Sequence, residues 1–143
     1  MSDLARVSEL AGSETGLCVI STSRPDGSSH ATVVNAGVLE HPVSGANVVG
    51  FVVRGNSHKL RHIARTGRCA LTFRRSWAWA GIEGPAQIVG PDPPADGIDL
   101  AQLLRDVFTA AGGTHDDWDE YDRVMVEERR AVVLVHPERV IGR

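Results

Sequence analysis

Basic side chains are concentrated in one short stretch of this chain, and their spacing suits the binding of an anion. The stretch turns at Gly55–Asn56 and then opens a predicted helix at Ser57; its cations are Arg54, Lys59, Arg61 and Arg65. The first N–H groups of a helix have no intrahelical partner and carry a partial positive charge, so a helix start binds anions. Cations near that end oppose the helix dipole and therefore indicate a negative partner. A solvated basic helix face is the alternative interpretation.

Polar and aromatic residues in two predicted strands are further candidates. Thr32 and Asn35 interrupt an otherwise apolar strand and face opposite sides, so each either contacts a ligand or makes cross-strand hydrogen bonds. Trp77 and Trp79 alternate on one predicted strand and so share a face, either as core or dimer contacts or as the wall of an apolar pocket. His30 titrates near neutrality when unperturbed, but the sequence offers no partner for it, which favours a structural role.

No pattern of residues indicates a catalytic acid, base, nucleophile or metal ligand set. The sequence contains no HExxH motif, no paired-Cys motif and no recognisable Ser-His-Asp arrangement. The acidic run from Asp116 to Asp122 lacks the glycine and terminal glutamate spacing of a calcium loop and is typical of a helix start. We therefore expect no metal site and assign no catalytic residue.

Length and composition limit the class of protein. The 143 residues fit one domain, residues 1–143, and the net charge of -3 is spread along the chain, which argues against nucleic acid as the main partner. No apolar run approaches the roughly 20 residues needed to span a bilayer, and the charged N-terminus is unlike a signal peptide. Cys18 and Cys69 lie in apolar runs and are interpreted as reduced core thiols. We expect a cytoplasmic protein with neither nucleic acid nor membrane as a partner.

Hydrophobic periodicity and turn residues predict a mainly β (α+β) fold. Apolar runs predict strands at residues 17–23, 28–39, 47–53, 69–73, 77–89 and 131–135. Helical spacing predicts helices at residues 4–10, 57–65 and 99–111 and another that begins at Thr114. A tight turn over Arg24–Gly27 joins the first two strands. Because the strands do not alternate with helices and no GxGxxG motif is present, we expect a small antiparallel barrel with flanking helices.

Four segments carry a resemblance to a known family. They are the hairpin Ser21–His30 with its R-P-D-G turn, the strand-to-helix segment Arg54–Arg65, the strand Ile82–Ile88 and the C-terminal part from His115 to Gly142. Over nearly its whole length the chain resembles the split β-barrel family typified by pyridoxamine 5′-phosphate oxidase, which implies an FMN-binding-like fold. The last segment resembles the actinobacterial branch of this family that binds the deazaflavin coenzyme F420.

The resemblance also implies an obligate homodimer with two cofactor sites at the subunit interface. Lys59 matches the family's phosphate-binding lysine, and Ser57 and His58 match neighbouring positions of the same pocket. Ser57 stands where the family often has a basic residue, a role that Arg54 or Arg61 would then have to fill. Further implied contacts are a strand along the cofactor ring (Thr32, Val33, Val34 and Asn35), a segment beneath it (Val52, Val53 and Arg54) and two indoles from either subunit (Trp77 and Trp79).

The resulting hypothesis is a coenzyme F420-dependent reductase that delivers hydride from the reduced coenzyme to a flat, small-molecule organic acceptor. In such an enzyme the cofactor carries the chemistry, and the protein supplies orientation and charge. F420 extends past its phosphate into an acidic oligoglutamate tail. Arg61 and Arg65 lie four residues apart on one predicted helix face, and together with Arg54 and Lys59 they would supply positive charge to bind this tail. The alternatives are an FMN-dependent oxidase or reductase of the same fold, and a cofactor-binding module without turnover.

Overall fold

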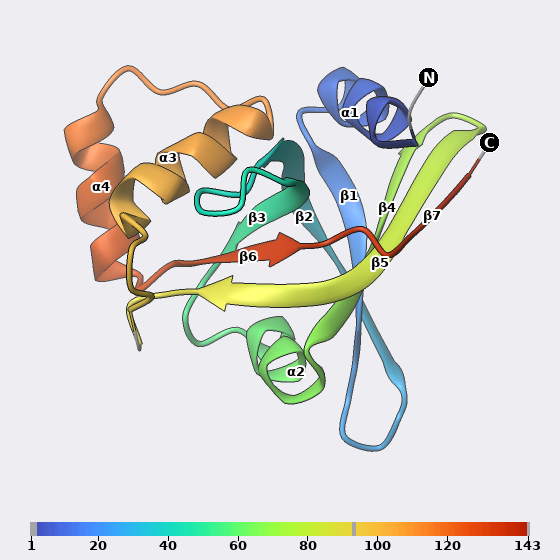
Figure 1. Cartoon of the computed structure of the whole chain (residues 1–143), viewed down its shortest axis with the longest axis horizontal. Helices are drawn as coiled ribbons and strands as arrows, with labels where there is room; N and C mark the ends of the chain where they lie inside the picture. The colour runs from blue at the N-terminus through green and yellow to red at the C-terminus, as the bar shows by residue number, and fades with distance from the viewer. Residues whose placement is uncertain (1–2, 93, 143) are drawn as a thin grey trace.

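Six antiparallel strands close into a barrel. The computed structural model describes residues 3–92 and 94–142. Neighbours follow the order β4-β1-β2-β3-β6-β5, pairing of β5 with β4 completes the circle, and a further strand, β7, is added to β5. The strands are β1 (Leu17–Ser23), β2 (Ser29–Glu40), β3 (Asn47–Val53), β4 (Arg68–Arg75), β5 (Ala78–Val89), β6 (Ala131–Val135) and β7 (Arg139–Gly142). Figure 1 shows the barrel with helices around it.

Two long strands, β2 and β5, each belong to both halves of the barrel. β2 pairs with β1 from Ser29 to Asn35 and with β3 from Ala36 onwards. β5 pairs with β4 as far as Pro85 and with β6 from Ala86 onwards. Each strand therefore changes its partner near its middle, and the barrel is split at these two points.

Four helices pack around the strands in the part of the chain that the structure describes: α1 (Asp3–Ser13), α2 (His58–Thr66), α3 (Leu100–Ala110) and α4 (Trp118–Glu127). α1 and α2 lie at opposite ends of the barrel, and α3 and α4 lie along one flank (Figure 1). α1 packs on β2, β4 and β5, whereas α3 packs on β2, β3 and β6. None of these helices is long and apolar enough to cross a membrane.

Two hydrophobic clusters lie on the two sides of the strands. One fills the barrel and includes the fully buried Phe51 and Phe73. The other joins the outer face of β6, at Val132 and Leu134, to Val107 and its neighbours on α3. β6 contributes to both clusters, so all of its residues are buried. Burial on both faces is why its sequence is a continuous apolar run rather than an alternating one.

Helix α2 begins and ends within one residue of the prediction. Ser57 is its N-cap, and the Ser57 Oγ accepts a hydrogen bond from the Leu60 N–H at 3.3 Å. At the other end Gly67 has a φ of 71°, and its N–H donates to the Ile63 carbonyl at 2.7 Å. Glycine adopts this left-handed conformation without a steric cost. Burial of Ile63 then fixes the helix against the barrel end, which positions the residues of its first turn.

The predicted antiparallel barrel with flanking helices is confirmed, with one additional strand and one shortened strand. β7 is absent from the sequence prediction because it is short, and it forms only by pairing with the distant strand β5, as at Ile82 and Val140. β5 begins at Ala78 rather than Trp77, because Ser76 and Trp77 form the turn that joins it to β4. Cys18 and Cys69 are buried free thiols, as predicted.

The start of α4 also differs from the prediction. The helix begins at Trp118 instead of Thr114, and Asp117 is its N-cap. The Asp117 carboxylate accepts a hydrogen bond from the Glu120 N–H at 3.1 Å. Thr114 resembles a cap in the sequence, but the residues after it stay irregular, and an aspartate is an equally favourable cap.

Gly84 lies where β5 leaves β4 and approaches the segment between β6 and β7. A Cβ at this position would lie 2.0 Å from the His136 carbonyl oxygen and 2.9 Å from the Glu138 nitrogen. Both of these residues are held in place, since their N–H groups donate to the carbonyls of Pro85 and Glu83. A side chain at Gly84 would therefore separate strands that the barrel needs in contact.

We predict that Gly84→Ala lowers the free energy of unfolding by about 2–3 kcal/mol, because the added methyl meets backbone atoms that cannot move aside. Gly12→Ala is the matched control: it lies in α1 with nothing within 4 Å of the new methyl, and it should raise the free energy of unfolding by roughly 0.5–1 kcal/mol. Urea unfolding followed by circular dichroism measures both changes. Equal stability of the two variants would contradict the proposed close approach.

Candidate functional site

A cavity opens at the side of the barrel where β2 changes its partner. The ladder between β2 and β3 ends at the pair Ala36 and Phe51, and the earlier part of β2 runs with β1 instead. β2 and β3 part from this point, and residues 33–35 and 52–54 line the gap from its two sides. Helices α3 and α4 form the opposite wall. The cavity volume is about 620 Å³, which is within the usual range for a small-molecule site.

The barrel side of the cavity is mainly apolar. Val34 and Val53 are buried, whereas Val33 is 56% exposed and forms an open part of the wall. Asn35 is a polar side chain of this wall, and its Nδ2 donates a hydrogen bond to the Thr15 carbonyl at 2.9 Å. This bond holds the turn between α1 and β1 beside the cavity. The result is an apolar surface with one fixed amide at its edge.

Aromatic and aliphatic side chains form the helical wall, which comprises Val107, Phe108, Tyr121 and Met125. The Tyr121 hydroxyl donates to the Leu104 carbonyl at 2.8 Å. Burial raises the pKa of Tyr121 to about 12, so the phenol stays neutral.

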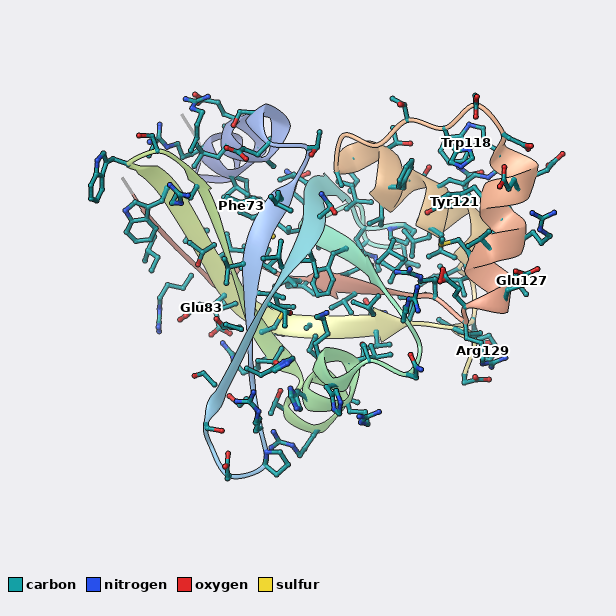
Figure 2. All side chains as sticks on the ribbon, turned by 180° about the vertical axis from the view of Figure 1, so that it is seen from behind. Phe73, Glu83, Trp118, Tyr121, Glu127 and Arg129 are labelled. Carbon is teal, nitrogen blue, oxygen red and sulfur yellow. The ribbon has the colours of Figure 1, made fainter. Side chains whose placement is uncertain are left out.

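The Phe108 ring lies against Gly113, where a Cβ would come within 2.6 Å of it. Phe108 also meets the Trp118 ring edge-on at 6.0 Å, and Figure 2 shows Trp118 and Tyr121 projecting from α4. The wall is therefore held in place on several sides.

Three cations line the cavity, and among the described residues no carboxylate does; the cations are Arg54, Lys59 and Arg130. The protein as a whole has a net charge of -3, so this concentration of positive charge is local. Lys59 is half-buried, and its ammonium makes no hydrogen bond or ion pair with any residue that the structure describes. The first N–H groups of α2 lie beside it and precede the first helical hydrogen bond. A cation and helix N–H donors are thus presented together to an anion.

Eight of the thirteen residues predicted to hold a cofactor line this cavity: Val33, Val34, Asn35, Val52, Val53, Arg54, Ser57 and Lys59. The other five lie elsewhere. Thr32 faces the barrel interior, where its Oγ1 is buried without a hydrogen-bond partner among the described residues. His58 and Arg61 lie on the exposed side of α2, where the Arg61 Nη2 donates to the His58 Nδ1 at 2.7 Å.

The two predicted indoles are also away from the cavity of this chain. Trp77 is 92% exposed in the turn between β4 and β5, so it does not share a strand face with Trp79, which pairs with Arg74 across the hairpin. The cations expected to bind an acidic tail differ as well. Arg61 donates to the Asn56 carbonyl and Arg65 donates to the Ser23 carbonyl, and neither lines the cavity.

Sequence reasoning missed the helical wall and one of the three cations. Phe108, Tyr121 and Met125 belong to apolar stripes at helical spacing, which indicate burial without showing what the stripe faces. Arg130 lies in the charged run that ends α4, and only its return toward the cavity distinguishes it from a surface arginine. No local signal in the sequence identifies either feature as part of a site.

A second polar cluster lies at the barrel end beneath α2. The His62 Nδ1 and the Thr22 Oγ1 are 2.9 Å apart, and the His30 ring meets the His62 ring edge-on at 5.1 Å. The His30 Nδ1 is buried and has no hydrogen-bond partner within the described part of the chain. Burial lowers the pKa of both imidazoles, and the nearby charges of Arg24 and Lys59 lower that of His30 further.

We predict that the protein loses stability as the pH falls below about 6.5, where imidazoles of the unfolded chain take up protons but His30 and His62 resist doing so. Their stabilising contribution is fully present above that pH and declines below it, because the unfolded state then binds more protons. The urea midpoint should fall between about pH 7.5 and about pH 5.5, and it should fall less in His30→Asn. If NMR titration gave both rings pKa values at or above the ordinary value for histidine, the predicted loss of stability would be ruled out.

Comparison with known proteins agrees with this architecture. A family model for pyridoxamine 5′-phosphate oxidase matches residues 9–143. The conserved hypothetical protein Rv2991 from Mycobacterium tuberculosis is 19% identical, with a TM-score of 0.72 over 99% of this chain and 84% of that one. An F420 reductase is 16% identical, with a TM-score of 0.63 over 94% of each chain.

A pyridoxamine 5′-phosphate oxidase-related, FMN-binding protein from Nostoc punctiforme PCC 73102 is 11% identical, with a TM-score of 0.59 over 95% of this chain and 79% of that one. At such low identities these structures share the fold, whereas the family match extends along the sequence itself. With that match and a barrel split at β2 and β5, this chain belongs to the pyridoxamine 5′-phosphate oxidase family.

Proposed function

We propose that this protein binds coenzyme F420 in the cavity between β2, β3 and α3 and uses the reduced coenzyme to transfer hydride to a flat organic acceptor. The observation that carries the proposal is the charge of the cavity, which has three lining cations and no carboxylate among the described residues. F420 combines a phosphate with an acidic tail, so its charge complements this site. The F420 reductase of the same fold supports the choice of coenzyme class.

The residues present fit such a coenzyme. Its phosphate would lie at Lys59 and the first turn of α2, where the Lys59 ammonium and the backbone N–H groups of His58 and Lys59 have no described partner. The third N–H group of this turn, that of Leu60, is already bound by the Ser57 cap. Its ring would lie along residues 33–35, with Phe108 on the opposite side of the cavity. The coenzyme supplies the hydride, and this chain supplies orientation and charge. An apolar acceptor would fit beside Val33, the open part of the wall.

FMN binding is the second candidate, and it is favoured by the FMN-binding protein of the same fold. FMN has a single phosphate, which Lys59 and the start of α2 would hold. It would leave Arg54 and Arg130 without an anionic partner from the ligand. A cofactor-binding module without turnover would bind in the same way and is distinguished by the absence of hydride transfer.

We predict that F420 binds at least about tenfold more tightly than FMN, a preference of roughly 1.4 kcal/mol, and that this preference shrinks as salt is raised. Lys59→Ala should weaken F420 binding by about 1–3 kcal/mol, the loss expected for a charge-assisted hydrogen bond. Arg61→Ala is the control, because Arg61 is exposed and lies outside the cavity. Fluorescence titrations measure each affinity. Equal or tighter binding of FMN would place the protein in the flavin-binding part of its family.

We also propose that the protein acts as a homodimer. Exposed apolar residues cross the outer surface of the sheet, since Val33 pairs with Val19 and both are exposed, and the exposed Leu17 lies two residues before Val19 on β1. The row continues through Thr72 and Gly81 to the exposed Ile141. A soluble protein rarely leaves such a surface uncovered. Because Val33 also lines the cavity, a partner subunit on this surface would border the site.

Val19→Arg should convert the dimer to a monomer, because it places a charge in the middle of the apolar row. Val43→Arg is the matched control, since Val43 is also exposed but lies in the loop between β2 and β3, outside that row. Light scattering on the wild type and both variants gives the subunit number. A monomeric wild type, or dimers in both variants, would refute the proposed interface.

A further inference from the structure

Two arginines that line the cavity are joined by one carboxylate. The Arg54 Nη2 lies 2.9 Å from the Glu128 Oε2, and the Arg130 Nε and Nη2 lie 3.4 Å and 3.2 Å from the Glu128 Oε1. The side chains of Glu128 and Arg130 are only 26% and 23% exposed, so this half of the cluster is partly removed from water, whereas Arg54 is 63% exposed. Glu128 itself is not among the residues that line the cavity. It therefore supports the two guanidinium groups from behind.

The end of α4 directs these side chains through its backbone. The Arg129 N–H donates to the Val126 carbonyl at 3.1 Å, and the Arg130 N–H donates to the Met125 carbonyl at 2.9 Å. These are the two hydrogen bonds of a Schellman motif, whose left-handed residue is usually glycine. Here it is Arg129, with a φ of 50°, at the helix end seen in Figure 2. Strained positions of this kind are often retained at binding sites.

Gly55 brings the start of α2 against this helix end. A Cβ on Gly55 would lie 2.5 Å from the Arg129 carbonyl oxygen. The close contact places Arg54, the residue before Gly55, beside Glu128, the C-cap of α4. The arginine pair thus depends on the contact between two turns that are distant in the sequence.

The pair retains the capacity to bind another anion. Each guanidinium has five N–H donors, and Glu128 contacts Arg54 through Nη2 alone and Arg130 through Nε and Nη2. The remaining N–H groups of Arg54 and Arg130 have no partner among the described residues. Two positive charges share one negative charge, and Lys59 on the same cavity adds a third positive charge. A ligand with a single phosphate would satisfy Lys59 and leave the pair unused.

We propose that Arg54 and Arg130, held side by side by Glu128, form a second anion subsite that binds a carboxylate of the ligand whose phosphate lies at Lys59. The assignment of the phosphate rests on the proposed function. The subsite accounts for a charge-based preference for a coenzyme with a carboxylate beyond its phosphate. Glu128 is a positioning residue, since it aligns the two arginines without lining the cavity.

The test compares the affinities of F420 and FMN for Arg54→Gln and Arg130→Gln. Each variant should weaken F420 binding about tenfold or more, as expected for a lost charge-assisted hydrogen bond, and should change FMN binding less than about threefold. The salt dependence of F420 binding should also decrease. Arg123→Gln is the matched control, because Arg123 lies on α4, is exposed, pairs with Glu127 and does not line the cavity. Arg54 is itself largely exposed, so Arg54→Gln decides the matter if Arg130→Gln fails to fold. Unchanged F420 affinity, or equal losses for both ligands, would overturn the subsite.

A second measurement separates this subsite from the proposed function. Citrate, a tricarboxylate without a ring or phosphate, is titrated into the wild type while NMR records the arginine Nε–H signals. Shifts of the Arg54 and Arg130 signals, lost in Arg54→Gln, would support the subsite even if F420 did not bind. Shifts that avoid both arginines would overturn it even if F420 did bind.

Discussion

The change of partner along β2 is the constraint on which the site depends. A strand has two hydrogen-bonding edges, and in β2 the edge toward β3 is paired only from Ala36 onwards. The preceding residues pair with β1 on the other edge, so the edge toward β3 is open beside the cavity. The split therefore creates both the space for a ligand and a row of residues to line it. Helix α2 follows β3 directly, which places its positively polarised start at the same opening.

Burial of β6 on both faces provides the second half of the site. A strand that is apolar on its outer face needs a cover, and α3 supplies it through Val107 and the residues around it. The C-terminal end of α3 then lies against β2, where a Cβ on Gly37 would be 2.2 Å from the Ala110 carbonyl oxygen. Packing of this outer cluster thus sets the distance between the barrel wall and the Phe108 side of the cavity. The chemistry of the site and the hydrophobic energy of the fold depend on the same contacts.

The elements of the barrel could be predicted from the sequence because each has a local signal. Alternation identifies β1 and β2, the Ser57 cap and Gly67 delimit α2, and a continuous apolar run identifies β6. The barrel side of the cavity follows from these elements. The helical side could not be predicted, because the apolar stripe that contains Phe108 has the same sequence pattern whether it packs on a strand or lines a cavity. Arg130 returns to the cavity only because Arg129 adopts a conformation usual for glycine, which no local pattern indicates.

Helix α4 reaches the barrel mainly through α3, and this has a consequence for divergence within the family. Its polar contacts are with α3, through Tyr121 to the Leu104 carbonyl and Asp122 to Arg105, the latter at 2.6 Å. Substitutions on α4 can therefore reshape the cavity while the barrel interior, which holds its own cluster, keeps its packing. α4 still contributes to the fold, because Tyr121 belongs to the outer cluster that covers β6, whereas the inner cluster contains no residue of α4. Changes at the cavity-lining Met125, which is only partly buried, would therefore alter the wall of the site while the barrel interior keeps its own packing.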